Sequence, residues 1–266
     1  MEALIREPAW FYPLSQIRKT TRSRLDGVSF TDELLGQSKG VQFITRMAIP
    51  LRLPPQTIFA AALFLHRFYI RHSLKRGHPY EIAAACLFLA CKTEESSRKL
   101  HEVAVIATKI GLKLPPTVHP SEVEHRNAKE VDKWTQRIRT TEDELLQALK
   151  FDFEDTSPYE HLNKLVHSYV PPEHHKLLGS TATFFINDSC LTMLSLSCSM
   201  PDLAVAALYW ASVSTKTPIP SSNNEKWYAG HLGRADILRI ISDMAEMMPV
   251  VQRSGVEVRH KYEKIA

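Results

Sequence analysis

The sequence predicts an all-helical fold built from two tandem helical repeats, and three observations point to it. Glycine supplies only 9 of the 266 residues, below the roughly 7% of average usage, so few turns that require positive φ are available. No segment shows the convincing alternation of apolar and polar residues that marks a half-buried strand. An alanine-rich apolar run, residues 82–91, recurs later in the chain at a constant offset, with Ala83 and Leu87 falling on Ala204 and Leu208.

The same offset extends the duplication beyond one helix. It places residues 61–66 on residues 182–187, so the copied unit is larger than a single hairpin. Lys92, however, falls on Val213, and the two glutamates that follow Lys92 have no acidic counterpart. The sequence therefore predicts one copy with a purely structural role and one copy that also binds something.

Residues 1–30 form an extension ahead of the first repeat. The segment is aromatic at Trp10, Phe11 and Tyr12 and then basic from Arg18 to Arg24. We expect it to be partly helical and to lie outside the first core.

Apolar residues at helical spacing predict five helices in the first repeat, residues 31–155. Prolines and glycine punctuate the pattern, and the expected helices are 31–49, 54–73, 79–91, 100–112 and 121–150. The third is apolar nearly all round, which is typical of a helix at the centre of a bundle. Ser121 and Glu124 have the S-x-x-E form of a capping box, so the fifth is expected to be one long helix.

The second repeat, residues 156–250, follows a short linker. Ser157, Pro158 and Glu160 combine an N-cap serine, a first-turn proline and a third-position acid, which together indicate a helix start. The other expected helices are 173–196, 201–214 and a segment around 237–244, with a further helix at 256–265 inside a tail of residues 251–266.

Composition limits the classes of function. The formal net charge of +4 neither demands nor excludes a nucleic-acid partner. Four cysteines lie in apolar stretches without a C-x-x-C pair, and the histidines lack a third ligand at suitable spacing, so we predict no metal site, no disulfide framework and no cofactor. Without a hydrophobic signal core or a run of about 18 apolar residues, an intracellular, soluble protein is expected.

Two tandem helical units, with Lys-x-Glu-Glu after an alanine-rich third helix, resemble the cyclin fold. Four segments are similar to signatures of transcriptional cyclins of the T and K type, whose kinase complexes are of the P-TEFb kind. They are FLHRFY at 64–69, CLFLACKTEE at 86–95, LKFDF at 149–153 and FINDS at 185–189. The resemblance implies an all-α fold of two tandem five-helix cyclin boxes with an N-terminal extension.

The resemblance also implies a kinase-binding site on the first box. In cyclins, a lysine at the end of the third helix and a glutamate in the fifth hold the kinase segment around its mobile C-helix; here they correspond to Lys92 and Glu142. The other implied contact residues are Leu89, Glu95, Leu146, Phe151 and Phe153. Such an apolar surface with a few charges suits a specific protein interface. Taken alone, the lysine would only complement the helix dipole, and the two phenylalanines would be core residues of the seam between the repeats as readily as interface residues.

By the same resemblance, the chain is a regulatory subunit with no catalytic residue of its own. We expect a heterodimer with a cyclin-dependent Ser/Thr kinase that phosphorylates the C-terminal domain of RNA polymerase II and regulates transcription elongation in the nucleus. Activation would follow from binding the inward state of the kinase C-helix more tightly than the outward state. No membrane partner is expected.

Two alternatives stay open. Transcription factors of the TFIIB type also pair two cyclin-like repeats, and they bind DNA through basic surfaces; residues 173–210 are poor in lysine and arginine, so direct nucleic-acid binding is not expected here. A scaffold would bind a kinase without activating it. An enzyme is disfavoured because the chain has no phosphate-binding glycine loop, G-x-S-x-G elbow or zinc-protease motif. For the basic run at 18–24, a solvated segment and a contact with nucleic acid, a kinase lobe or an import receptor remain alternatives.

Overall fold

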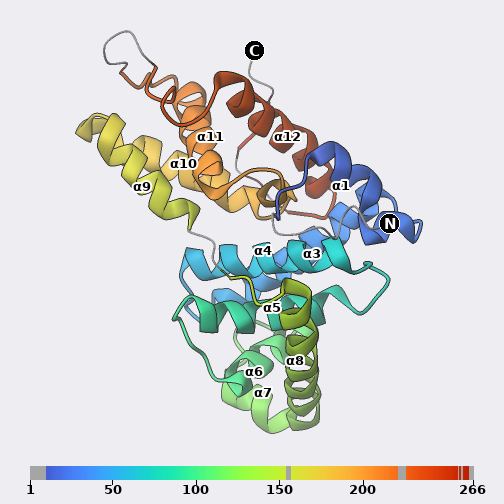
Figure 1. The fold of residues 1–266 in the computed structure, drawn as a ribbon. Coiled ribbons are helices and arrows are strands. Elements are labelled where there is room, and N and C mark those ends of the chain that lie inside the picture. Colours follow the sequence, from blue (N-terminus) through green and yellow to red (C-terminus); the bar gives the residue numbers. More distant parts are fainter. Residues whose placement is uncertain (1–9, 154–156, 221–225, 257, 259, 264–266) are drawn as a thin grey trace. The chain divides into compact units, whose positions relative to one another are not determined.

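The computed structural model describes residues 10–153, 157–220, 226–256, 258 and 260–263, and all regular structure in these residues is helical. The chain divides into two compact units. Lys19–Phe153 forms the first unit, and the second unit combines the residues up to Arg18 with those from Glu154 onward. Figure 1 shows the helices of both.

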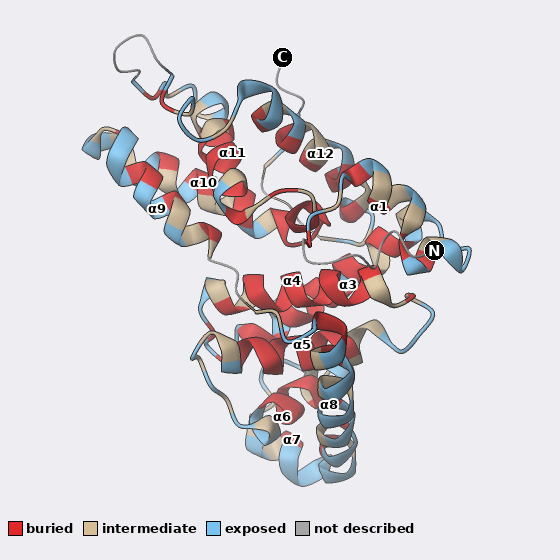
Figure 2. Ribbon diagram, in the orientation of Figure 1, coloured by how far each residue is buried: buried red, intermediate tan, exposed pale blue. Residues whose placement is uncertain are grey.

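The first unit is a bundle around one central helix. Its helices are α2 (Arg22–Leu25), α3 (Phe30–Ala48), α4 (Pro55–Arg71), α5 (Pro79–Thr93), α6 (Leu100–Gly111), α7 (Pro120–Arg126) and α8 (Ala128–Leu149). Helix α5 packs against α3, α4 and α8, and every residue from Ile82 to Cys91 is buried (Figure 2). This confirms the predicted central position, which small alanine side chains make possible by letting neighbouring helices approach closely.

The predicted single helix after Ser121 is wrong, because the chain bends at Asn127, with φ −122° and ψ 28°, and separates α7 from α8. Ser121 is not the N-cap either. His119 precedes Pro120 and accepts a hydrogen bond from the Ser121 N–H on Nδ1 at 3.3 Å. Glu124, the expected partner in the capping box, lies 2.8 Å from His101 Nε2 on α6 instead.

The second unit repeats the arrangement with α11 at its centre. Its helices are α1 (Leu14–Thr20, through Arg18), α9 (Pro158–Tyr169), the 3-10 turn η1 (Pro172–His174), α10 (His175–Ser189), the 3-10 turn η2 (Leu194–Leu196), α11 (Met200–Ser214) and α12 (Arg234–Gln252). Helix α11 packs against α9, α10 and α12. The N-terminal segment joins this unit, since Arg18 lies 2.6 Å from Glu246 on α12 and the Tyr12 N–H donates to the Leu196 carbonyl at 2.6 Å.

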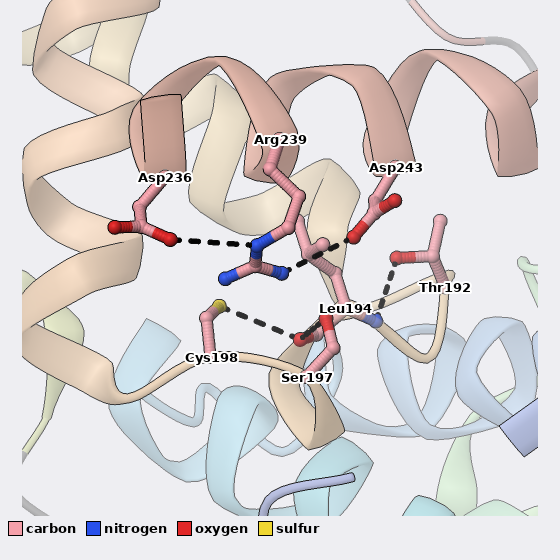
Figure 3. Close-up of polar contacts among 7 residues, drawn as sticks. All are labelled: Thr192, Leu194, Ser197, Cys198, Asp236, Arg239 and Asp243. Carbon is pink, nitrogen blue, oxygen red and sulfur yellow. Dashed lines mark hydrogen bonds and ion pairs between the residues drawn. The ribbon is translucent and has the colours of Figure 1, made fainter. Parts of the chain in front are cut away.

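The helix predicted to run through to Leu196 ends at Ser189. Beyond it, Thr192 Oγ1 donates to the Ser189 carbonyl at 2.8 Å and accepts from the Leu194 N–H at 3.2 Å. Such local bonds from threonine to the backbone compete with the helical hydrogen-bond pattern. Figure 3 shows this turn, in which the Leu194 N–H bonds to Thr192 and the Leu194 carbonyl accepts from the Cys198 thiol.

Helix α12 is longer than the segment predicted around 237–244. In Figure 3 the Arg239 guanidinium lies between two carboxylates of its own helix, 3.7 Å from Asp236 and 3.5 Å from Asp243. Burial raises the pKa of Asp243 despite the nearby arginine. The tail helix predicted at 256–265 is wrong over its described residues, which are not helical; residues 257, 259 and 264–266 lie outside the described part.

The inferred duplication agrees with the burial of equivalent positions. Ala83 and Ala204 are both 0% exposed, as are Leu87 and Leu208. The equivalent polar positions differ. His66 is 0% exposed and bonded to the amide of Gln37 on α3 at 2.7 Å. Asn187, its counterpart, is exposed, and its amide oxygen accepts a 2.7 Å hydrogen bond from the Tyr159 hydroxyl.

The four cysteines are buried and form no disulfide with one another. Within the described residues, no helix is both long and apolar enough to cross a membrane. In that same part of the chain, no three histidine, cysteine or acidic side chains come together as a metal site would require.

Candidate functional site

The candidate site forms where the end of α5 meets α8. Lys92, in the last turn of α5, directs its ammonium at Glu142 on α8, with Nζ 2.7 Å from Oε1 and 2.9 Å from Oε2. The two residues are far apart in sequence and meet because α5 and α8 pack side by side along the first unit. The pairing of Lys92 with Glu142 is therefore present in the free chain.

The end of α5 leaves its last charges in solvent. Helix α5 stops at Thr93, and the Glu94 N–H bonds back to the Ala90 carbonyl at 2.9 Å. Glu95 then takes a left-handed conformation, with φ 52°, and its exposed carboxylate has no partner within the described residues. An exposed acidic side chain thus lies three residues beyond the lysine.

The ion pair of Lys92 and Glu142 contributes little to stability. The Lys92 side chain is 49% exposed and that of Glu142 13% exposed, and a pair at such a surface is typically worth about 0–1 kcal/mol. Lys92 Nζ also lies 4.2 Å from the centroid of the Phe88 ring, one turn earlier on α5, which holds the lysine in place by a cation–π contact. The lysine therefore faces solvent, whereas the Glu142 side chain that it pairs with is largely covered.

The apolar residues predicted around the pair differ in how much surface they offer. Leu89 is only 4% exposed, Leu146 is half-buried and Phe151 is 66% exposed. Phe153 is half-buried because its ring packs edge-on against Phe64 of α4, with centroids 5.7 Å apart. Phe151 thus presents the largest apolar surface of the four, whereas Leu89 mainly supports the site from beneath.

The backbone at Phe151 is strained. Lys150 and Phe151 both have left-handed φ, 54° and 57°, as the chain turns at the end of α8. The Phe151 N–H closes this turn on the Leu146 carbonyl at 3.2 Å. A left-handed non-glycine residue costs on the order of 1–3 kcal/mol, although single residues of this kind also end other helices of this chain, as at Lys113 and Lys216. An exposed aromatic ring held in this way is a feature typical of a binding site.

Sequence reasoning missed the supporting residues. Phe88 was treated only as a core position of the repeat, and Phe64 only as part of a family signature. Arg67 on α4 is 2% exposed and directs Nη1 at the Asp152 carbonyl at 3.5 Å. A second pair, Arg137 and Glu81 at 3.3 Å, joins α8 to the first turn of α5, at the opposite end of that helix from Lys92, and is not part of the site. The i to i+4 spacing of Phe88 and Lys92 could have revealed the cation–π contact; the other contacts depend on tertiary packing.

Comparison with known sequences gives consistent relatives. The family model "Cyclin, N-terminal domain" matches residues 33–154. Cyclin pch1 of Schizosaccharomyces pombe is 33% identical over 88% of this chain and 70% of its own length. Cyclin-T1-4 of Arabidopsis thaliana is 30% identical, and Cyclin-T of Drosophila melanogaster 28% identical, over 82% and 98% of this chain. The chain spans only 40% and 22% of those two relatives.

Solved structures share the fold. A chain of the yeast RNA polymerase II CTD kinase complex CTDK-1 superposes with a TM-score of 0.67 at 17% identity, covering 96% of this chain and 78% of that one. A chain of the yeast TFIIK complex (Kin28/Ccl1/Tfb3) gives a TM-score of 0.57 at 16% identity, covering 92% and 94%.

Proposed function

This chain belongs to the cyclin family, and on that premise we propose that it is the regulatory subunit that binds and activates a cyclin-dependent Ser/Thr kinase. The proposed binding surface is centred on Lys92 and Glu142 and includes Leu89, Glu95, Leu146, Phe151 and Phe153. The observation that carries the proposal is the preformed pair of Lys92 and Glu142, at 2.7 Å. The same unit also presents the exposed ring of Phe151, whose backbone is left-handed.

The proposed chemistry of binding follows from this geometry. Phe151 and Leu146 supply apolar surface that a partner can bury, and the charges of Lys92, Glu142 and Glu95 set the register of the partner and disfavour wrong partners. Because Lys92 and Glu142 are already joined, little side-chain freedom remains to be lost on binding.

The proposed mechanism of activation is selection of one kinase conformation. Phosphoryl transfer in protein kinases requires a C-helix glutamate to pair with the lysine that holds the ATP phosphates. A partner can shift the C-helix inward only if it binds that state more tightly than the outward one. The surface around Lys92 would therefore contact the mobile C-helix directly, and no residue of this chain needs to touch ATP.

The proposed substrate is the C-terminal domain of RNA polymerase II. This rests on relatives named T-type cyclins and on the shared fold with a chain of a polymerase CTD kinase complex. Control of transcription elongation, and with it a nuclear location, follows as part of the proposal. So does the division of labour: residues 31–155 form the kinase-binding box, residues 156–250 the second box, residues 1–30 an extension and residues 251–266 a tail.

Charge reversal at the site tests the proposal. We expect Lys92→Glu and Glu142→Lys each to abolish co-purification of the kinase from cells that express the tagged chain, and to abolish kinase activity on polymerase repeat peptide. Helical content and thermal stability should stay close to wild type, because a surface pair of this kind contributes about 0–1 kcal/mol.

The matched control is Arg137→Glu. It breaks the other ion pair between α5 and α8 and reverses one charge, but it should leave kinase binding intact. Kinase binding that survives both Lys92→Glu and Glu142→Lys would refute the site. Recovery of promoter DNA with no kinase would favour the TFIIB-like alternative, and recovery of a kinase that stays inactive would favour a scaffold.

A further inference from the structure

A second candidate binding site lies in the second unit, in a groove between α9 and α11. The groove has a volume of about 350 Å³ and is closed at one side by the turn that carries Gly230 and His231. Pockets that bind ligands commonly measure about 300–1,000 Å³. None of the residues proposed to bind the kinase lines it.

One face of α9 forms one wall of the groove. His161, Lys164, Leu165 and Ser168 form a stripe on a single helical face, because each is three or four residues from two of the others. This stripe is about 10 Å long at 1.5 Å rise per residue. An extended peptide of about three residues has the same length, so the groove matches a short peptide segment in size.

The floor of the groove is apolar. Leu165 on α9 and Val205 on α11 are 6% and 2% exposed, and the ring of Pro201 lies beside them. Tyr169 ends the α9 wall and is fixed from two sides: its hydroxyl lies 2.9 Å from His231 Nε2, and its ring centroid is 5.9 Å from that of Trp227. A ligand that fills this groove must bring at least one apolar side chain.

The rim of the groove carries charges of both signs. Lys164 is exposed, and its ammonium has no hydrogen-bond or ion-pair partner within the described residues. His161 and His231 add imidazole rings to the lining, and Asp202 on the α11 wall is the acidic residue among the described residues that line the groove. The complementary ligand therefore carries a carboxylate toward the α9 wall and a hydrogen-bond donor toward Asp202.

We propose that this groove binds a short segment of a partner protein in which an acidic residue lies close to an apolar one. The apolar side chain enters between Leu165 and Val205, and the carboxylate pairs with Lys164. The partner would be a protein other than the kinase, so the chain could hold both at once through separate units.

The test is affinity selection of a random dodecapeptide display library on the purified full chain. Enriched peptides should share an acidic residue near an apolar one. A labelled copy of the leading peptide should bind Lys164→Glu and Ser168→Glu at least about tenfold more weakly than wild type in fluorescence anisotropy, because both variants place negative charge on the rim. Lys164→Arg keeps the positive charge and should bind the peptide about as tightly as wild type.

Lys176→Glu is the matched control, since Lys176 is exposed on α10 in the same unit and does not line the groove. It should bind the peptide as wild type does. Selection that yields no acidic peptide, or binding that is unchanged in Lys164→Glu, would overturn the proposal. Binding of a labelled oligouridylate that is lost in Lys164→Glu would overturn it in favour of RNA.

Discussion

Thr21 donates a 2.7 Å hydrogen bond to the carboxylate of Glu33, which is 0% exposed. The same hydroxyl caps α2 by accepting from the Arg24 N–H at 3.3 Å. One threonine therefore starts α2 and ties it to α3. Burial raises the pKa of Glu33, while hydrogen bonds from Thr21 and Ser23 and the charge of Arg24 lower it in part.

The raised pKa of Glu33 makes stability depend on pH. Above the ordinary glutamate value of about 4.3, the unfolded chain has released this proton while the folded chain still holds it, so the free energy of unfolding falls as pH rises. In Glu33→Gln this contribution disappears. Urea denaturation between pH 4 and 7 should therefore show wild type losing stability relative to Glu33→Gln as pH increases. A difference that stays constant with pH would show that Glu33 does not titrate in this way.

The sequence predicted those features of the fold that depend on the residues of a single helix, and missed those that depend on contacts formed only in the folded chain. The alanine-rich run correctly predicted that α5 lies at the centre of its unit, because burial on all sides is visible in the composition of a single helix. The breaks at Asn127 and after Ser189 were missed, since neither position carries proline or glycine. The turn after Ser189 uses hydrogen bonds of the Thr192 hydroxyl, whereas the break at Asn127 is a change of backbone conformation without a side-chain cap. The family pattern named Lys92 and Glu142, but only the fold brings them to 2.7 Å.

Replacing Phe151 by glycine should separate binding from stability. The left-handed conformation at φ 57° costs a residue with a Cβ about 1–2 kcal/mol, and glycine avoids that cost while losing about 0.5–1 kcal/mol of chain entropy. We expect Phe151→Gly to be as stable as wild type or slightly more so in thermal denaturation. Kinase affinity should fall on the order of 30-fold, as for a central aromatic contact.

Lys150→Gly provides the control for Phe151→Gly. Lys150 has the same left-handed backbone, with φ 54°, so it should show the same small change in stability while binding the kinase normally. Equal kinase affinity in the two variants would mean that Phe151 is not an interface residue.

Tyr262 should anchor the tail to the second unit. Its ring lies 4.9 Å from that of Trp210 and 5.6 Å from that of Phe185, and its hydroxyl donates to Asp188 at 2.5 Å. Tyr262→Ala should cost about 3–5 kcal/mol, as for loss of a buried aromatic side chain, and Tyr262→Phe about 1–3 kcal/mol, since Asp188 loses a donor. Amide hydrogen exchange in α10 and α11 should be faster in Tyr262→Phe than in wild type, and fastest in Tyr262→Ala. Unchanged exchange in Tyr262→Ala would show that the tail does not stabilise these helices.

Replacing either of two helix glycines by alanine should change the stability of the chain in opposite directions. A Cβ at Gly40 on α3 would lie 2.8 Å from Cδ2 of Leu65, which is 0% exposed and cannot move into solvent, so Gly40→Ala should cost about 1–3 kcal/mol. At Gly179 on α10 the nearest atom, on Val166, is 4.0 Å away. Gly179→Ala should therefore stabilise the chain by about 1 kcal/mol, the difference in helix propensity. Both variants can be compared by denaturant titration, and a gain in stability at both sites would mean that α3 and α4 can separate to admit a methyl group, contrary to the close packing at Gly40.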